Sequence, residues 1–217
     1  MPNHVVPTYL IHRSPCDFEV TGKGSSPAWQ HAKCLTDFSY PWETEVPSST
    51  RLRALHSDHW VYFLFDVEDR RTHIDVISND KREVIDSSRV EIFFTRDARM
   101  SPYYCLELDA AGRVLDYRGE FHRQFEFDWA WPANDLIVKA ARTAGGYTVE
   151  AAVSKDSLQA LELLNADQLR AGLFRAECTH TVVPREHMRW ISWVRPDSAT
   201  PDFHIPSAFG LLKLEGN

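Results

Sequence analysis

The sequence predicts an all-β protein, in which about twelve short strands and one short helix form a single β-sandwich. The strongest evidence is residues 60–67 (WVYFLFDV), which are apolar on both faces of an extended chain. A strand without a polar face belongs at the centre of a sheet that is covered on both sides. Residues 89–95 (RVEIFFT) supply a second run of this kind, and polar turns follow at short intervals along the chain. Two buried strands predict a core between two sheets.

The size and charge of the chain limit the classes of function. The 217 residues show no break in composition and no internal repeat, so we expect one domain over residues 1–217. The formal net charge is −7 and no basic run is present, which argues against nucleic acid or an anionic membrane as partner. No apolar run reaches 18 residues and no secretory leader is visible. We expect a soluble protein, cytoplasmic by default, or secreted if a leader has been removed.

The N-terminal half is predicted to hold five strands. Residues 4–12 form a first strand, which Pro7 keeps at an edge or a bulge. Residues 17–21 and 34–38 are strands on either side of one helical turn, residues 27–32, which presents Trp29 to the core. A surface loop, residues 41–49, leads to a hairpin in which residues 50–56 and 60–67 are joined by the polar turn at 57–59.

The C-terminal half continues with hairpins. After a polar connection over residues 70–88 and the strand at 89–95, residues 103–109 and 114–118 pair through a turn in which Gly112 takes a positive φ. An aromatic loop covers residues 121–131. Residues 136–143 and 147–153 form a hairpin, and residues 155–164 form the helix, capped by Ser154 or Asp156. Residues 169–181, 188–194 and 209–214 are the last strands.

Cysteine and histidine spacing does not predict a metal or redox centre. Cys16, Cys34, Cys105 and Cys178 are scattered without C-x-x-C spacing, and three of them lie in predicted strands, where a buried thiol is favoured over a disulfide. The histidines are isolated, without the pairwise spacing of zinc sites; they include His56, His59, His122, His180, His187 and His204.

Several segments, taken in order, resemble carbohydrate-binding module family 9. They are SPAWQHA, WVYFLFDVED, SSRVEIFFT, YYCLELDAAGRVLD, GYTVEAAVSKDSL, LRAGLFRAE and the closing WISWVRPDSATPDFHIPSAFGLLKL. The resemblance extends from about residue 16 to residue 214. It implies an antiparallel, jelly-roll-like sandwich and a non-catalytic domain that binds an oligo- or polysaccharide, as an accessory in the use of xylan- or cellulose-type polymers.

The resemblance also implies a binding site. Sugar binders of the family hold a ring between two tryptophans, whose positions correspond here to Ile85 or its neighbours, where no aromatic residue stands, and to Phe203. The acidic residue of the family is retained as Glu91. A basic residue is replaced by Glu107, and Thr200 stands at a polar loop position.

The chemistry of sugar recognition explains why such residues are needed. A sugar ring has an apolar face and a polar rim, so its site combines an aromatic plate with charged or amide groups. Phe203 is either this plate or a plug of the core. We expect Glu91 and Glu107 to contact Arg175, either to recognise hydroxyl groups or as a structural ion cluster that includes Glu177.

Other tryptophans divide between the core and the site. Trp129 and Trp131 are candidates for the missing plate, because their loop is rich in aromatic residues and either caps the core or lines a cleft. We assign Trp60, Trp190 and Trp193 to the core.

Three further hypotheses remain open. The sandwich pattern also resembles haem-binding DOMON-type electron-transfer domains, for which Met100 or Met188 with a nearby histidine would be ligands. A degenerate module that serves as a protein-interaction surface is the third reading of function. Carboxylates at Asp66, Glu68 and Asp69, or over residues 80–86, are candidates for structural calcium. The carboxylate pairs do not by themselves predict an enzyme, because the sequence fixes no separation between them.

Overall fold

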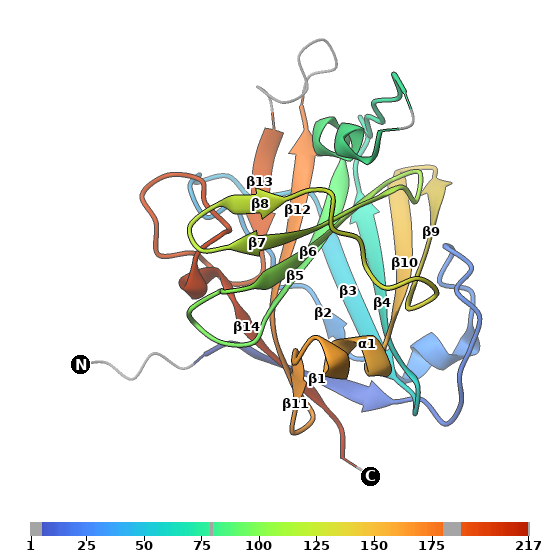
Figure 1. Ribbon diagram of the computed structural model, residues 1–217. Coiled ribbons are helices and arrows are strands. Elements are labelled where there is room, and N and C mark those ends of the chain that lie inside the picture. Colours follow the sequence, from blue (N-terminus) through green and yellow to red (C-terminus); the bar gives the residue numbers. More distant parts are fainter. Residues whose placement is uncertain (1–5, 79, 180–187, 217) are drawn as a thin grey trace.

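The computed structural model describes residues 6–78, 80–179 and 188–216, which form two layers of β-sheet (Figure 1). The first sheet has the order β8-β7-β6-β5-β12-β14 and the second β3-β4-β10-β9. In Figure 1 the strands from β5 to β8 cross in front of the second sheet. The strands of the first sheet are β5 (Arg89–Thr95), β6 (Tyr103–Asp109), β7 (Val114–Glu120), β8 (Gln124–Glu126), β12 (Gln168–Cys178) and β14 (Gly210–Leu214). Those of the second are β3 (Thr50–His56), β4 (Trp60–Glu68), β9 (Leu136–Thr143) and β10 (Gly146–Ser154).

Short elements complete the two sheets. Strand β2 (Cys34–Leu35) pairs with β3, while β11 (Leu164–Asn165) and β13 (Met188–Ser192) pair with β12. In the described part of the chain, the helices are the 3₁₀ turns η1 (Pro27–His31), η2 (Lys81–Asp86) and η4 (Pro206–Ala208), and α1 (Lys155–Ala160). The predicted sandwich of short strands with one short α-helix is therefore confirmed.

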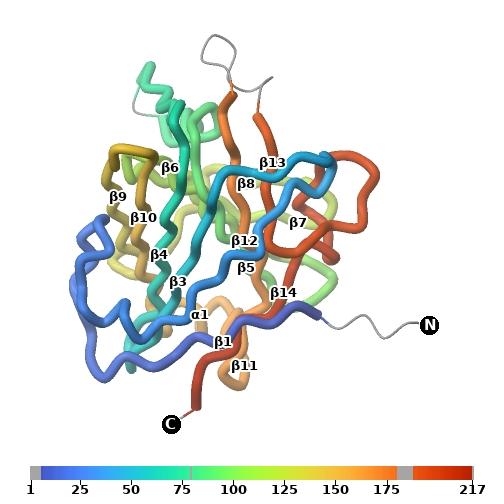
Figure 2. Tube along the Cα trace, turned by 180° about the vertical axis from the view of Figure 1, so that it is seen from behind, coloured from blue at the N-terminus to red at the C-terminus, as the bar shows by residue number. Residues whose placement is uncertain are grey.

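Strand β1 (Thr8–Arg13) joins the two sheets. Its first four residues run parallel to β14 of the first sheet, and His12 and Arg13 run parallel to β3 of the second. Figure 2 shows β1 lying beside both neighbours. The predicted edge position is wrong, because Pro7 precedes the strand and its carbonyl accepts a hydrogen bond from Leu211. Because Pro7 lies outside β1, its missing N–H group removes no hydrogen bond from the strand, and β1 lies inside the sheet.

The predicted central strand is confirmed. Strand β4 lies between β3 and β10, and Phe63 and Phe65 are fully buried in the main core between the two sheets. Its alternate residues, Tyr62 and Leu64, face the other way, into a smaller apolar cluster that contains Trp29. The 3₁₀ turn at 27–31 thus presents Trp29 to the protein interior as predicted.

A second apolar cluster covers the outer face of the first sheet. Phe93 of β5 and Phe174 of β12 belong to it, and Tyr117, Phe203 and Phe209 join them from β7 and from the C-terminal segment. Loops therefore cover this face of the sheet, and the covered face holds the site described below.

Several boundaries differ from those predicted. Residues 17–21 are not a strand, because the backbone at Thr21 and Gly22 donates to the carboxylate of Glu150 instead of to a neighbouring strand. Helix α1 begins at the predicted cap, where Ser154 accepts from Ser157, but ends at Ala160, and Glu162 takes a positive φ of 58°. The aromatic loop at 121–131 contains β8.

Other predicted features are found as expected. Gly112 has a φ of +82°, and Cys34, Cys105 and Cys178 lie in strands. Thr181, His180 and His187 lie outside the described residues.

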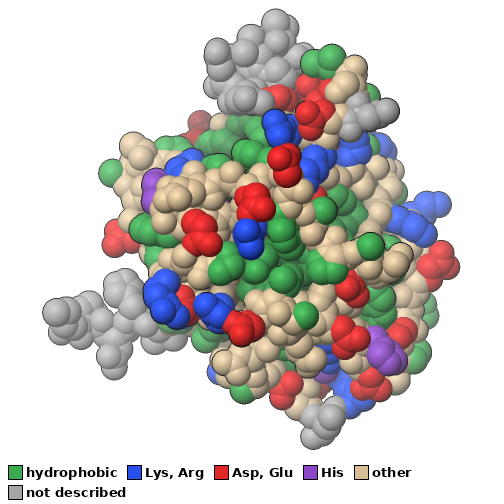
Figure 3. Space-filling model, in the orientation of Figure 1, with side chains coloured by type: hydrophobic (Ala, Val, Ile, Leu, Met, Phe, Trp, Pro, Cys, Tyr) green, Lys and Arg blue, Asp and Glu red, His purple; other side chains and the backbone are tan. Residues whose placement is uncertain are grey.

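On the face seen in Figure 3, basic and acidic side chains lie next to one another over the strands of the first sheet. Within the described ranges, no helix is both long enough and apolar enough to cross a membrane.

Candidate functional site

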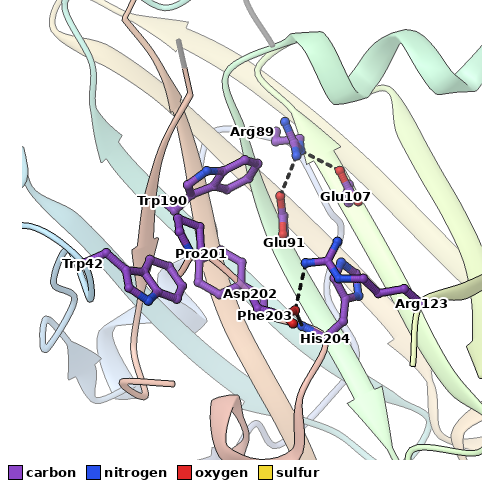
Figure 4. A pocket seen from close by; sticks show the side chains of 10 residues that line it. All are labelled: Trp42, Arg89, Glu91, Glu107, Arg123, Trp190, Pro201, Asp202, Phe203 and His204. Atoms are coloured by element: carbon purple, nitrogen blue, oxygen red, sulfur yellow. Dashed lines mark hydrogen bonds and ion pairs between the residues drawn. The ribbon is translucent and has the colours of Figure 1, made fainter. Parts of the chain in front are cut away.

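A cavity of about 200 Å³ lies on the outer face of the first sheet. Figure 4 shows its side chains, which come from strands β5, β6 and β13 and from three loops. They are Trp42, Arg89, Glu91, Glu107, Arg123, Trp190, Pro201, Asp202, Phe203 and His204. The cavity lies over the middle of β5, where Glu91 shares the outer face of that strand with Phe93.

Two acidic side chains form the floor of the cavity. Glu91 of β5 and Glu107 of β6 stand directly opposite each other in the antiparallel ladder. Like charges at such a position repel each other. Arg89, two residues before Glu91 on the same face, lies between them: its Nη2 is 2.9 Å from Oε1 of Glu91, and its Nε is 2.6 Å from Oε2 of Glu107. The three residues are only 2–5% exposed.

Neighbouring groups hold this ion cluster in place. Nη1 of Arg89 donates to the carbonyl of Ile85 at 2.7 Å, and the guanidinium lies 5.6 Å from the centre of the Trp190 ring. The Tyr117 hydroxyl donates to Oε1 of Glu107 at 2.9 Å. The guanidinium is thus fixed by the backbone, by two carboxylates and by an aromatic face, which makes the floor rigid.

The protonation of Glu91 differs from that of a surface carboxylate. Burial raises the pKa of Glu91, the charge of Glu107 raises it further, and Arg89 opposes both, which leaves the pKa at about 8. Glu91 therefore takes up a proton at a higher pH than an exposed carboxylate does. In that form its carboxyl group donates one hydrogen bond and also accepts.

Aromatic side chains form one wall. The Phe203 ring stacks on Phe174 with centroids 4.1 Å apart and an interplanar angle of 11°. Trp190 lies edge-on to Phe203 at 5.8 Å, and Trp42 lies 5.5 Å from it. Phe203 is 5% exposed. The ring packs into the second apolar cluster, as expected for a plug of the core. It also lines the cavity, and its role as a sugar plate stays a prediction.

The opposite rim is a polar network around Asp202. Its carboxylate accepts from Arg123 Nη2 and from His122 Nε2, each at 2.9 Å, and from the backbone of His204. Burial alone would raise the pKa of Asp202, but these hydrogen bonds lower it. His204 lies 2.9 Å from the Tyr103 hydroxyl, and burial lowers its pKa to about 3, so this imidazole is neutral.

The prediction that Arg175 contacts Glu91 and Glu107 is wrong. In the pairing of β12 with β5, Arg175 stands opposite Val90 and Phe174 stands opposite Glu91, so Arg175 points to the other face of the sheet. There its Nη2 lies 3.1 Å from Glu177 and 3.6 Å from Asp69, and Nη1 donates to Ser48. The predicted pairing of Arg175 with Glu177 is found, within a separate ion cluster.

The predicted supporting residues lie elsewhere. Trp131 is buried in the main core and donates to Ser157 at 3.0 Å, and Trp129 packs against Tyr104. Thr200 is exposed outside the cavity lining. The prediction that Trp129 or Trp131 supplies a second plate is therefore wrong.

Trp42 and Trp190 line the cavity in their place. Trp190, which we assigned to the core, is half-buried beside Arg89. Trp42 was missed because it lies in a loop without a pattern, and its Nε1 donates to the carbonyl of Ser198. Arg89 could have been found from the sequence, since strand alternation places it on the same face as Glu91.

Structural calcium stays a prediction for the carboxylates named from the sequence. Among the described residues, no three His, Cys, Asp or Glu side chains are grouped for metal binding. Asp66 pairs with Arg51, Asp69 lies beside Arg175, and Asp80 caps η2. Each of these candidate carboxylates is thus engaged by the protein itself.

Comparison with known proteins identifies similar folds. A family model described as carbohydrate family 9 binding domain-like matches residues 20–217. A structure from Bacteroides uniformis, described as a proposed carbohydrate-binding protein, is 15% identical, with a TM-score of 0.75 over 97% of this chain and 100% of that one.

Two further structures are of a family 9 carbohydrate-binding module from Caldicellulosiruptor kristjanssonii. The complex with glucose is 15% identical, with a TM-score of 0.63 over 96% of this chain and 97% of that one. The complex with cellotriose is 14% identical, with a TM-score of 0.64 over 96% and 95%. No curated protein matches the sequence.

Proposed function

Because the chain belongs to the carbohydrate family 9 binding domain-like family, we propose that the cavity on its first sheet binds a sugar without catalysing a reaction on it. The observation that carries the proposal is the meeting of the aromatic wall, formed by Trp42, Trp190 and Phe203, with the charged floor at Glu91 and Arg89. Aromatic rings cover the apolar face of a sugar, and the fixed charges accept and donate hydrogen bonds to its hydroxyl groups.

The structural neighbours support the class of ligand. Modules of similar fold have been crystallised with glucose and with cellotriose. A cavity of about 200 Å³ offers room for one sugar ring at the end of a chain. We therefore propose an oligo- or polysaccharide ligand whose backbone is of the cellulose or xylan type, and a role as an accessory to enzymes that degrade polymers with such a backbone.

The arrangement of the carboxylates supports binding over hydrolysis. Glycosidases place two carboxyl groups on either side of the scissile bond, about 5–10 Å apart. Here Glu91 and Glu107 are ion-paired with one guanidinium at the same side of the cavity. Met100, a candidate haem ligand, is fully buried in the second apolar cluster, and nothing in the described part of the chain favours haem binding.

Isothermal titration calorimetry with cellotriose and xylotriose tests the proposal. Trp190→Ala should weaken binding at least about tenfold, because one face of the wall is lost. Trp60→Ala is the matched control, since Trp60 is also half-buried but lies on the outer face of the second sheet. Equal affinities of the Trp190→Ala and Trp60→Ala variants would contradict a sugar site in this cavity. No measurable heat of binding with either sugar in the unmodified protein would contradict a site for neutral chains of the cellulose or xylan type.

A further inference from the structure

The cavity has more acidic than basic side chains. Its charged lining consists of three carboxyl groups, Glu91, Glu107 and Asp202, and two guanidinium groups, Arg89 and Arg123. Arg123 is paired with Asp202 at the rim. On the floor, one guanidinium therefore faces two carboxyl groups. A buried charge requires a partner, so the floor lacks one positive charge for full compensation.

The missing charge belongs beside Glu91. Glu107 has two partners, Arg89 and the Tyr117 hydroxyl. For Glu91 the described residues supply only Arg89, although this side chain is 2% exposed. The raised pKa of Glu91 has the same cause: the protein compensates the second carboxylate with a proton.

We propose that the sugar bound here carries a basic amine, as in a 2-amino-2-deoxy hexose, and that its ammonium group pairs with the carboxylate of Glu91. This inference rests on the sugar site proposed above and names the class of sugar. The ammonium group takes the place of the proton on Glu91. The floor then has two positive groups, the ammonium and the Arg89 guanidinium, for its two carboxylates. Trp190 and Trp42 suit such a ligand as well, because the face of an indole attracts cations.

Other sugars fit this lining less well. A neutral sugar meets Glu91 in its protonated form and leaves the charge of the floor unchanged. A uronic acid adds a fourth carboxylate to the lining, and the guanidinium at the rim, Arg123, is already held by Asp202 at 2.9 Å. The charges of the cavity lining therefore favour a sugar with an amine over a neutral sugar, and a neutral sugar over one with a carboxylate.

The proton balance of the reaction follows from these groups. The titratable and charged side chains around Glu91 are Arg89, Cys105, Glu107, Tyr117, Arg123, Asp202 and His204. Of these, His204 is neutral, with its pKa lowered to about 3, so it does not exchange a proton near neutral pH. When an ammonium ligand binds near pH 6.5, the carboxyl group of Glu91 loses its proton to the buffer. A neutral sugar binds without this release.

Three disaccharides with one β-1,4 backbone test the proposal on the unmodified protein. They are cellobiose, the glucosamine disaccharide from chitosan, and N,N′-diacetylchitobiose, which differ only at carbon 2. Calorimetry at pH 6.5 should show the glucosamine disaccharide binding at least about tenfold more tightly than cellobiose, as for one additional ion pair. Acetylation should remove this gain. Titration in two buffers of different ionisation enthalpy should show proton release only for the amine.

Two variants test whether Glu91 is the source of the preference for the amine. Glu91→Gln should bring the ratio of the two affinities, amine over hydroxyl, to about one. Glu126→Gln, which changes an exposed carboxylate paired with Arg118 on β7, should keep the ratio of the unmodified protein.

Two results would overturn the proposal in different ways. If cellobiose binds as tightly as the amine, the inference fails and the sugar site stands. If none of the three sugars binds, the sugar site fails together with the inference.

Discussion

Arg89 is the residue on which the floor of the cavity depends, and replacing it tests the charge arrangement directly. Arg89→Met keeps much of the length of the side chain and removes its charge. Glu91 and Glu107 then face each other with no cation between them, at 2% and 5% exposure. Breaking a buried ion pair in this way costs about 3–5 kcal/mol. For a domain of this size, each kcal/mol lowers the melting temperature by about 2–4 °C, so we expect a decrease of roughly 6–20 °C.

The pH dependence of the defect follows from Glu91. Its pKa is about 8 in the folded protein, against 4.5 without the surrounding structure. Arg89 lowers this pKa, so Arg89→Met raises it further. A group whose folded pKa lies above its unfolded pKa stabilises fully below the unfolded value, and this contribution is lost as pH rises towards the folded value. Below pH 8 Glu91 is protonated in both proteins, so the variant should lose more stability, relative to the unmodified protein, at pH 9.5 than at pH 5.

Urea denaturation at pH 5 and pH 9.5, followed by tryptophan fluorescence, measures both effects. Arg118→Met is the matched control, because Arg118 pairs with Glu126 on the surface and exposed pairs contribute less than about 1 kcal/mol. If Arg89→Met and Arg118→Met lose similar free energies of unfolding, or if the loss for Arg89→Met is the same at both pH values, the ion cluster does not hold the floor together.

Three other predictions concern the aromatic wall, the core and the rim. Phe203→Ala should abolish sugar binding, which calorimetry measures. It should also lower the free energy of unfolding by about 3–5 kcal/mol in urea denaturation, because the ring is buried against Phe174. Phe63→Ala, at the centre of the main core, should cost about 3–5 kcal/mol without a direct effect on the cavity, and a melting temperature lowered by only a degree or two would contradict the central position of β4. The folded pKa of His204, about 3, lies below its unfolded value of 6.5, so its contribution is full above pH 6.5 and is lost as pH falls towards 3. His204→Gln should therefore make stability between pH 6.5 and pH 4 less dependent on pH, and an unchanged slope in denaturation experiments would exclude His204 as its source.

The longer strands could be predicted because each of them carries its own signal in the sequence. Residues 50–56, 89–95 and 103–109 alternate or are apolar on both faces, and the structure gives these bounds without change. Period-two patterns depend on local geometry alone, so no partner strand has to be known. The predicted strand at 17–21 is wrong because local patterns do not show distant partners. The carboxylate of Glu150, which accepts the backbone hydrogen bond of Thr21, lies far away in the sequence.

The site could be predicted only in part. Glu91, Glu107 and Phe203 were named from the sequence and line one cavity. Arg175 was misplaced because the face on which it lies depends on the register of β12 against β5, and a shift of one residue reverses the face.

Trp42 and Arg123 show a different limit of sequence reasoning. Both lie in connections whose course is set by contacts far away in the chain, such as the hydrogen bond from Trp42 to Ser198 and the ion pair of Arg123 with Asp202. Neither residue belongs to a periodic pattern. Loop residues of this kind meet at a site only once the whole sheet has formed beneath them.

Because the side chains of the floor are buried and hold one another in place, the floor is already formed before a ligand binds. Arg89 is held by Glu91, Glu107 and the carbonyl of Ile85 before any sugar arrives. The wall is likewise fixed, since Phe203 stacks on Phe174. Side chains that are already ordered lose little conformational entropy on binding, so more of the interaction energy remains as affinity. In this cavity, stability and affinity therefore depend on the same contacts, and a change to Phe203 or Arg89 should alter both.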